Sequence, residues 1–485
     1  MEEAAKTRRN KKDTLINISS DTFVRVVILL AVLLILSIVL TYVIPAGEFG
    51  RLENGETDYS VFGYRSADEG KGIAWWRGLL APLLVFASSD GLSLIMLTLF
   101  LLVISAAFQV MNDVGGISAI VGSVSERFRT KRRLLLAAVS FIFMCFGAFL
   151  GLFEEMLTML PVVCLLCVVI GYDSFTGFLL SVVSCGFGFA SAVTNPFTVL
   201  LASDIIGVNP VETIWYRLII FAVMYGLLLG FIFLYAGKIE KDPSASFTLA
   251  ADERLRASGA ADAPGTGGEE DTSKKRIIYS VFIAAALALI IISSVTDALR
   301  SYTVVILLAY FLIFGPVAGI AASGKPALVF RSFGRGILGA LPTVAFIALA
   351  SSVKFVLEEG GVLPTVVHQI NLMTADRSPF AVAAVLYLII IVLEFFISSS
   401  TAKAFLVMGI LSVSSVGLSK NMLVLLYTFA DGYTNLIFPT SPVLLISLSM
   451  IGFEYYKWVK KSLPLFAVNL LLVAVFAALG IVIGI

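Results

Sequence analysis

Charged side chains inside long apolar runs are the residues of this sequence whose chemistry stands out. Four acids and one base lie in such runs: Glu154, Glu155, Glu394, Asp431 and Lys403. A charge within a bilayer costs on the order of 3 kcal/mol on insertion scales, and charges kept there usually serve function. Structural ion pairing is the alternative, above all for Lys403, which could neutralise Glu394. We predict a substrate or ion site around these five residues.

Two apolar segments long enough to cross a membrane are interrupted by residues that break helices. Asn195 is a good N-cap and Pro196 suits the first position of a helix, so the half-helix after them would direct its positive end at the break. Thr440 and Ser441, followed by Pro442, offer a similar start in the second half. Irregular backbone at membrane depth is tolerated only around a cavity. The breaks therefore predict a site that favours an anionic group, with a simple kink in a packed helix as the alternative.

The remaining candidates for substrate or ion binding are hydroxyl, amide and glycine residues near the same breaks. They are Ser191, Thr194, Ser398, Ser399, Ser400, Thr401, Gly432, Thr434 and Asn435. The hydroxyls of the run 398–401 could ligand a cation or a substrate, with packing between helices as the alternative. We expect no metal site and no cofactor. Sodium, bound near Asn195 and Asn435, or a proton remains open as the coupling ion.

The composition indicates that these residues belong to a membrane protein. Of the 485 residues, 59% are hydrophobic and 14% are charged, whereas about a quarter of the residues of soluble proteins are charged. Apolar runs of roughly 20 residues recur along the chain, which is the length that spans a bilayer as a helix. The net charge of +1 gives no concentrated basic surface for nucleic acid. With one histidine and no catalytic motif, the sequence does not predict an enzyme.

Clusters of lysine and arginine orient the predicted spans, because such clusters stay on the cytoplasmic side. They occur before the first apolar run and near residues 127–133, 238–241, 274–276 and 457–461. All of them share one side only if two segments enter and leave the membrane on the same side, as re-entrant hairpins. The sequence therefore predicts an all-α inner-membrane protein of about nine transmembrane helices and two hairpins. Its N-terminus would be cytoplasmic and its C-terminus extracytoplasmic.

The two halves of the chain repeat one order of features from opposite sides of the membrane. In each half a hairpin precedes a broken helix, and Glu155 precedes Asn195 as Glu394 precedes Asn435. Inverted repeats with paired broken helices predict a secondary transporter whose substrate binds at the midplane. The predicted segments are a cytoplasmic tail 1–24, a first half 25–235 with hairpin 134–170 and broken helix 174–206, a flexible cytoplasmic linker 236–276, and a second half 277–485 with hairpin 378–416 and broken helix 419–451.

Several motifs resemble those of a known transporter family. They are Gly151-Leu-Phe-Glu-Glu155 and Asn195-Pro-Phe197 in the first half, and Ser398-Ser-Ser400, Ala402-Lys403-Ala404 and Thr434-Asn-Leu-Ile-Phe-Pro-Thr-Ser441 in the second. With them the sequence resembles the YfcC-like family, which belongs with the DcuC-type C4-dicarboxylate carriers and the basic amino-acid antiporters. The resemblance implies the fold of the ion transporter superfamily, similar to AbgT-type carriers, with a homodimeric assembly and an elevator-type mechanism.

The charges rank the candidate substrates. Four acids against one lysine within the apolar zone suit a cationic or zwitterionic substrate, or bound protons, better than a dianion. We therefore expect a symporter or antiporter of a small amino acid, with arginine/ornithine exchange ahead of C4-dicarboxylate or other carboxylate transport coupled to sodium or protons. A channel is the alternative from a different class. The expected partners are a small-molecule substrate, membrane lipid and a second copy of the chain.

Overall fold

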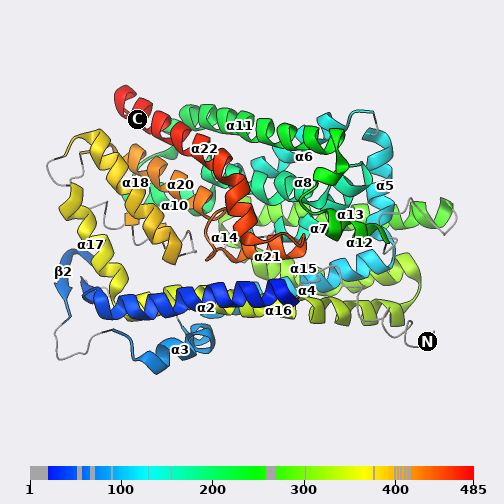
Figure 1. The fold of residues 1–485 in the computed structure, drawn as a ribbon, viewed down its shortest axis with the longest axis horizontal. Coiled ribbons are helices and arrows are strands. Elements are labelled where there is room, and N and C mark those ends of the chain that lie inside the picture. Colours follow the sequence, from blue (N-terminus) through cyan, green and yellow to red (C-terminus); the bar gives the residue numbers. More distant parts are fainter. Residues whose placement is uncertain are drawn as a thin grey trace.

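The computed structural model is built mainly of helices, most of which run along one direction, horizontal in Figure 1. Among the described residues, eight helical segments are long and apolar enough to cross a membrane. They are Phe23–Val43, Leu94–Asp113, Arg132–Leu150, Pro210–Lys241, Val304–Ser323, Pro326–Glu359, Pro379–Phe396 and Tyr455–Ile483. The predicted all-α polytopic membrane architecture is confirmed.

The structure describes most of the chain, with gaps that matter for the second hairpin. The described residues are 20–51, 57–65, 72–88, 91–128, 130–154, 156–257, 269–300, 302–374, 377–397, 400, 403–404, 407–408, 411 and 417–485. The predicted site residues Glu155, Ser398, Ser399 and Thr401 lie outside these ranges.

Four long helices form what we call the scaffold layer. They are α2 (Ser20–Val43), α4 (Gly91–Asp113), α15 (Thr303–Ser323) and α16 (Pro326–Glu359). Helix α16 packs along both α2 and α4, and α15 packs along α4, so the layer appears as a row of helices in the lower part of Figure 1. The close approach of α16 to α4 depends on Gly336, where a Cβ atom would lie 2.5 Å from the Cα atom of Ala106.

Smaller elements cover the two ends of the scaffold layer. At one end the antiparallel strands β1 (Gly47–Arg51) and β2 (Thr57–Tyr64) pack near α17 (Val362–Thr374), where the His368 ring stacks on Phe62 at 3.9 Å. Other elements around this layer are α3 (Trp75–Leu84), η2 (Val85–Ala87), α5 (Gly116–Phe128), α13 (Glu269–Val295) and α14 (Asp297–Arg300). Helix α13 packs along α15 and against α5.

A helical hairpin lies at the residues where the sequence predicts the first re-entrant hairpin. Its first arm is α6 (Arg132–Cys145), which continues as η3 (Phe146–Leu150), and its second arm is α7 (Met156–Val169). Between them the chain turns at Gly151, whose φ angle of +69° is left-handed and favours glycine. Residues 151–153 of the tip are buried, and the second arm packs against α8 and α5.

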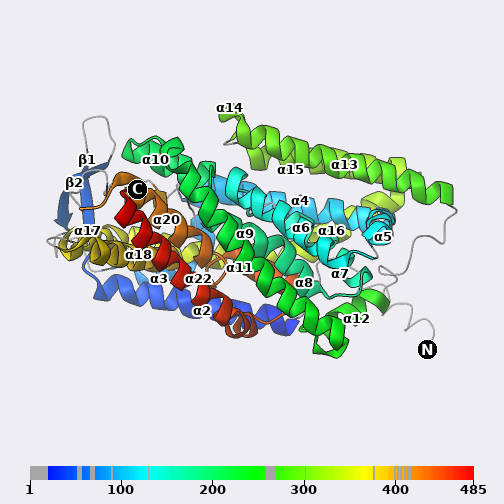
Figure 2. The same cartoon turned by 90° about the horizontal axis from the view of Figure 1, so that it is seen from above.

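The first broken helix follows directly and is interrupted between residues 191 and 195. The pieces before the break are α8 (Ser174–Phe178), η4 (Leu179–Val183) and α9 (Ser184–Ala190). Those after it are η5 (Pro196–Leu200) and α10 (Leu201–Ile206). In Figure 2, α8 lies toward the end of the molecule that holds α12, and α10 lies toward the end that holds the strands. The segment therefore traverses the molecule despite its break.

The second half repeats this order from the opposite end of the molecule. Helix α18 (Pro379–Phe396) starts at the end that holds the strands, whereas α6 starts at the other (Figure 1). The second broken helix consists of α20 (Lys420–Thr434) and α21 (Pro442–Met450) and is followed by α22 (Tyr455–Ile483). In the first half, η6 (Pro210–Thr213) and α11 (Ile214–Lys241) occupy the place of α22.

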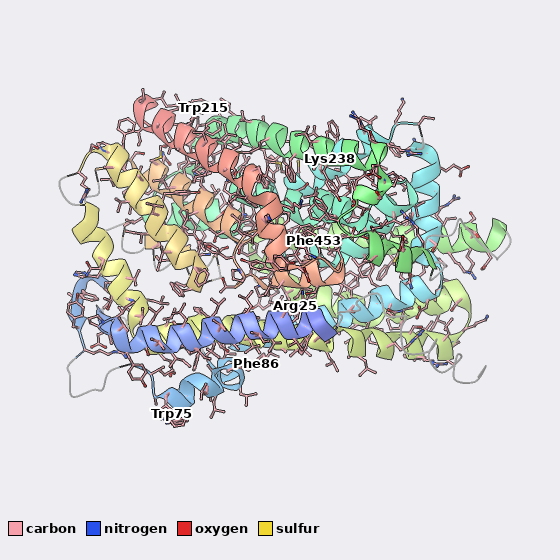
Figure 3. The ribbon with its side chains drawn as sticks, viewed as in Figure 1. Arg25, Trp75, Phe86, Trp215, Lys238 and Phe453 are labelled. Atoms are coloured by element: carbon pink, nitrogen blue, oxygen red, sulfur yellow. The ribbon has the colours of Figure 1, made fainter. Side chains whose placement is uncertain are left out.

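The two ends of the molecule differ in the side chains that they carry. Figure 3 places Trp75 and Trp215 on the side of the end that holds the strands, and Arg25 and Lys238 farther along the molecule toward the opposite end. Both tryptophans are exposed, as expected of residues at a membrane interface. The basic end is the one that the sequence analysis assigns to the cytoplasm.

The linker predicted to be flexible contains folded elements. Helix α11 extends to Lys241 and is followed by η7 (Pro243–Ala245) and α12 (Leu249–Ala257), and α13 starts at Glu269. The described part of the range 236–276 is therefore mostly helical, which differs from the expectation from its Ala, Ser and Gly content.

Two side chains explain why this part of the linker is ordered. The buried Asp252 carboxylate accepts hydrogen bonds from the Ser174 backbone N–H at 3.2 Å and from the Thr248 hydroxyl at 2.8 Å. Phe247 stacks on Phe453 at 5.8 Å between ring centroids. Burial raises the pKa of the Asp252 carboxyl, although the hydrogen bonds from Ser174 and Thr248 oppose this shift.

Candidate functional site

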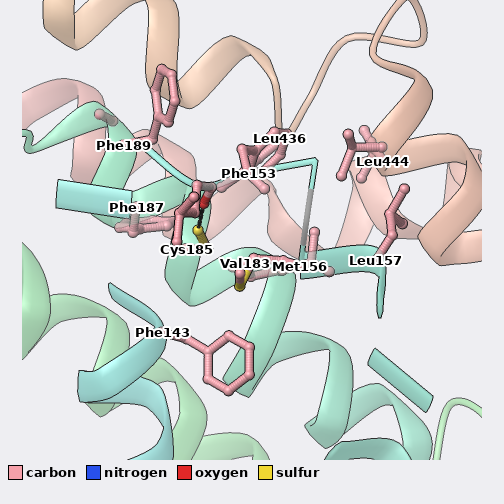
Figure 4. Packing of buried hydrophobic residues seen from close by; sticks show 14 of the residues in the cluster. Phe143, Phe153, Met156, Leu157, Val183, Cys185, Phe187, Phe189, Leu436 and Leu444 are labelled. Carbon is pink, nitrogen blue, oxygen red and sulfur yellow. Dashed lines mark hydrogen bonds between the residues drawn. The ribbon is translucent and has the colours of Figure 1, made fainter. Parts of the chain in front are cut away.

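The two broken helices cross one another just before their breaks. Gly432 near the end of α20 lies so close to Ala190 at the end of α9 that a Cβ atom would overlap the Ala190 backbone. A Cβ atom on Gly186 would lie 2.7 Å from the side chain of Leu436. Figure 4 shows the buried apolar residues around this crossing, to which the first hairpin, α9 and the second half all contribute. The fold therefore brings the two breaks into one region.

Asn195 occupies the N-cap position predicted from its sequence. It is completely buried, and its Oδ1 atom accepts a hydrogen bond from the Phe197 N–H at 2.9 Å, with Pro196 at the first position of η5. Its Nδ2 group donates to the Gly147 carbonyl at 3.3 Å. Asn195 thus starts the second half-helix and joins it to the first hairpin.

The other polar groups of the first break bond to backbone. The N–H groups of Val193 and Thr194 donate to the Ala148 carbonyl at 2.9 and 3.2 Å, and the Thr194 hydroxyl donates to the Phe149 carbonyl at 3.3 Å. The Ser191 hydroxyl donates to the Phe187 carbonyl at 2.6 Å. The first break is therefore a neutral structure whose donors satisfy carbonyls freed at the end of the first hairpin arm.

Glu154 makes no ion pair with the charged residues of the second half in the described structure. It is exposed and follows the turn at the tip of the first hairpin, where its backbone carbonyl accepts from the Leu157 N–H at 3.2 Å. Among the ion pairs of the described residues, none joins Glu154 to Lys403. The structure thus brings together the charges of the second half but not those of both halves.

Three charged residues of the second half form a buried cluster, which we call the charge triad. The Lys403 ammonium, with no exposed surface, pairs with the Glu394 carboxylate and with Asp431 Oδ1 at 2.6 Å. Asp431 is equally buried, and the Glu394 side chain is 1% exposed. Glu394 comes from the end of α18 and Asp431 from α20. Sequence reasoning anticipated the Lys403–Glu394 pair but not the second pair with Asp431.

Hydroxyl and amide groups surround the charge triad. The Ser400 hydroxyl donates to Asp431 Oδ2 at 2.7 Å, and the Thr434 hydroxyl lies 3.2 Å from Glu394 Oε2. The Asn435 amide donates to the Asp431 backbone carbonyl at 2.8 Å. Tyr427 donates its hydroxyl to the Ser400 carbonyl. Sequence reasoning did not single out Tyr427, whose position one turn before Asp431 is its only sequence signal.

The charge triad carries one more acid than base. If all three groups are ionised, two carboxylates face one ammonium, for a net charge of −1. The Glu394 Oε1 atom is buried without a hydrogen-bond partner among the described residues. Because an uncompensated charge in a low-dielectric interior is costly, the triad is suited to accept one further positive charge or a proton.

The second half-helix begins at Ser441, as predicted. The Ser441 hydroxyl accepts from the Leu444 N–H at 3.5 Å, and Pro442 takes the first helical position of α21, next to the buried Thr440. Ser441-Pro442 is thus the structural counterpart of Asn195-Pro196.

Asn195 and Asn435 follow the same Thr-Asn order in the sequence but hold different positions at their breaks. Asn435 is the C-cap of the piece before its break, whereas Asn195 is the N-cap of the piece after its break. The matching Thr-Asn pairs suggested equivalence, but helix α20 continues through Thr434, so the second break begins later relative to its Thr-Asn pair.

The carbonyls freed at the second break bond to aromatic side chains. The Trp458 indole N–H donates to the Leu436 carbonyl at 2.6 Å, and the Tyr455 hydroxyl donates to the Ile437 carbonyl at 2.7 Å. Both donors come from the start of α22. Trp458 is fully buried, while Trp215 near the start of α11 is 51% exposed.

The fold and the two crossing breaks define a helical multi-pass membrane protein with a buried polar centre. Its family follows from sequence comparison, in which the DcuC family model, C4-dicarboxylate anaerobic carrier, matches residues 23–482. The chain belongs to this family of membrane transporters, and its resemblance to that group is confirmed.

Two relatives match about three quarters of the chain. One is the Escherichia coli (strain K12) protein named "Putative basic amino acid antiporter YfcC", which is 25% identical over 76% of this chain and 74% of its own. An uncharacterised protein of Haemophilus influenzae is 22% identical over 77% of this chain and 73% of its own.

Two solved transporter structures show a distant likeness. The YdaH transporter of Alcanivorax borkumensis, whose topology is described as unusual, has a TM-score of 0.44 at 14% identity, over 95% of this chain and 99% of its own. MtrF of Neisseria gonorrhoeae, described with a class of antimetabolite efflux pumps, has the same TM-score and identity over 94% and 95%.

Proposed function

We propose that this protein is a secondary-active transporter of a small amino acid, and that exchange of basic amino acids such as arginine and ornithine is its first candidate activity. Membership of a transporter family is established above, while the substrate is our inference. The observation that carries it is the charge triad, in which Glu394 and Asp431 face the single base Lys403 at the crossing of the two broken helices.

A basic amino acid complements the polar groups around the crossing. Its cationic side chain would compete with Lys403 for the Glu394 and Asp431 carboxylates. Its carboxylate is suited to the N-terminus of α21, which starts at Pro442 after the Ser441 cap, because helix N-termini favour negative charge. One substrate molecule would thus neutralise the excess negative charge of the triad with its side chain and bind the N-terminus of α21 with its carboxylate.

Alternating access would follow from movement of the crossing helices against the scaffold layer, as in an elevator. Support comes from the contact between the two parts, where a small cavity is lined mainly by apolar side chains, among them Phe108 of α4, Leu157 of α7 and Ile446 of α21. An apolar contact with few fixed hydrogen bonds permits sliding better than an ionic one.

The proposal extends to the setting of the transporter. We place it in the inner membrane as a homodimer, with the N-terminus and the basic clusters in the cytoplasm and the C-terminus outside. Sodium or a proton is the coupling ion, and the net negative triad is its proposed site together with the region near Asn195 and Asn435.

A carboxylate is the second candidate substrate, because the family is described as one of C4-dicarboxylate carriers. In this case sodium or protons would neutralise the triad and the half-helix N-termini would bind the substrate carboxylates. A channel is the third candidate, and it would conduct without saturable counterflow.

Purified protein in proteoliposomes distinguishes these candidates. Vesicles loaded with unlabelled ornithine should accumulate labelled arginine, while vesicles loaded with succinate should not. Asp431→Asn should reduce this exchange at least tenfold. Lys420 is the control, because its ammonium bonds only to the Ile206 carbonyl among the described residues. Lys420→Gln should therefore keep the exchange rate within about twofold of the wild type. Robust succinate flux without arginine exchange would overturn the ranking, and conductance without counterflow would indicate a channel.

A further inference from the structure

Arg217 is a buried basic residue that the proposed mechanism does not use. It lies near the start of α11, two residues after Trp215, which Figure 3 places toward the end opposite Lys238. Trp215 is exposed, whereas Arg217 is 2% exposed and faces the protein interior. The guanidinium is therefore held inside the protein close to one membrane boundary.

The Arg217 guanidinium has no partner of opposite charge in the described structure. Its Nε and Nη1 atoms are buried without hydrogen-bond partners, and no described carboxylate lies within ion-pair distance. Arg335 shows the usual arrangement, in which the guanidinium pairs with Asp113 at 2.6 Å. A guanidinium stays charged in proteins, so Arg217 cannot avoid the cost of burial by losing its proton.

A second donor without a partner lies at the start of the same helix. Thr213 is one turn before Arg217, is buried, and its Oγ1 atom has no hydrogen-bond partner among the described residues. Thr213 is the N-cap of α11, and Arg217 lies on the buried face of this helix with Tyr216, Ile220 and Met224. A guanidinium and a hydroxyl thus share an interior surface with unmet hydrogen-bonding capacity.

We propose that Arg217 and Thr213 form a binding site for an oxyanion, a carboxylate or a phosphate group. The forked donors of a guanidinium match the paired oxygens of these groups, and the hydroxyl supplies a third bond. The site carries a charge opposite to that of the charge triad and comes from a different helix. It does not depend on the substrate proposed above. Its oxyanion comes either from solution or from a phospholipid headgroup near the boundary marked by Trp215.

Thermal unfolding of delipidated full-length protein in detergent tests this site. In low-salt HEPES buffer, acetate or phosphate should raise the Tm of the wild type by at least about 3 °C, because ligands that bind only the folded state stabilise it. Potassium chloride at matched ionic strength controls for screening. A separate titration with phosphatidylglycerol identifies the source: a response to the lipid alone assigns the site to a headgroup, and a response to the soluble anions assigns it to a free oxyanion.

Substitution of Arg217 and substitution of Arg335 should change the Tm in opposite directions. Arg217→Met should have a higher Tm than the wild type without oxyanion, because the unpaired charge is gone, and should not respond to oxyanion. Arg335→Met should have a lower Tm, because Asp113 loses its cationic partner and keeps, among the described residues, only the hydrogen bond from Gln109, yet should respond like the wild type. If Arg217→Met fails to fold, Arg217→Lys should respond more weakly than the wild type. A wild type that responds to none of the anions, or variants of Arg217 that respond equally, would overturn the proposal.

Discussion

The two broken helices of this transporter solve the same structural problem with different chemistry. In the first, Asn195 and backbone groups satisfy the freed carbonyls, and the hydrogen bonds of Ser191, Thr194 and Asn195 join neutral groups. In the second, Lys403 and Asp431 place buried charges beside the break. We therefore propose that the first break mainly shapes the site and that the second recognises the charge of the substrate.

Lys403→Met should have the largest effect on stability. It leaves Glu394 and Asp431 buried without their shared cation, and breaking a buried ion pair costs about 3–5 kcal/mol. We expect a clear loss of Tm in detergent. Lys420→Met, which removes a single bond to a carbonyl, is the control and should lose much less. Equal losses would mean that the charges of the triad contribute no more than an ordinary hydrogen bond.

Gly432→Ala should have the second-largest effect on stability. A Cβ atom at this position overlaps the backbone of Ala190, and overpacking costs about 1–3 kcal/mol. The helices would separate at the crossing, so exchange activity should fall together with the Tm. Gly226→Ala, where a Cβ atom has no neighbour within 4 Å, serves as the matched control and should behave like the wild type. An active, stable Gly432→Ala variant would contradict the close crossing.

Asn195→Ala should have a moderate effect on stability. It removes an N-cap, which costs about 1 kcal/mol, and the bond to Gly147. Transport should be abolished while the protein still inserts and assembles, because the start of the half-helix is lost. Asn195→Asp retains the capping oxygen but loses the donor to the Gly147 carbonyl and buries a carboxyl group, so its Tm should also stay below that of the wild type. Transport by Asn195→Ala at the wild-type rate would remove the first break from the mechanism.

Asn435→Ala should have the smallest effect on stability. Its amide makes one bond to the Asp431 carbonyl from a half-buried position, and such a bond contributes about 0.5–1.5 kcal/mol. We expect a smaller change in Tm than for Asn195→Ala. Exchange should nevertheless be lost, because this bond positions Asp431, whose carboxylate belongs to the charge triad. If the two asparagine variants lose equal stability, their different structural positions have no energetic consequence.

Local signals explain which features could be predicted from the sequence. The hairpin at 134–170, the two breaks and the caps at Asn195 and Ser441 depend on neighbouring residues, and the structure agrees with them. The order in the linker depends instead on contacts with distant elements, such as Asp252 with Ser174. Composition alone therefore suggested flexibility there.

Tertiary contacts explain what the sequence analysis missed. The pairing of Lys403 with Asp431 joins α20 to a residue that precedes it by 28 positions in the sequence, and no spacing rule connects the two residues. The Thr-Asn pairs alone did not show that Asn195 starts a helix piece and Asn435 ends one, because the exact ends of helices depend on what satisfies the freed carbonyls. In the second half those donors are Trp458 and Tyr455 from α22.

The account rests on recognition of a cationic group by the acids of the second half. The most direct test compares binding of arginine with binding of citrulline, which has nearly the same shape but a neutral side chain. Wild-type protein should prefer arginine at least tenfold, and Glu394→Gln should reduce this preference to about twofold or less while citrulline affinity stays similar. A Glu394→Gln variant that keeps the full preference for arginine would contradict the central role of the charge triad.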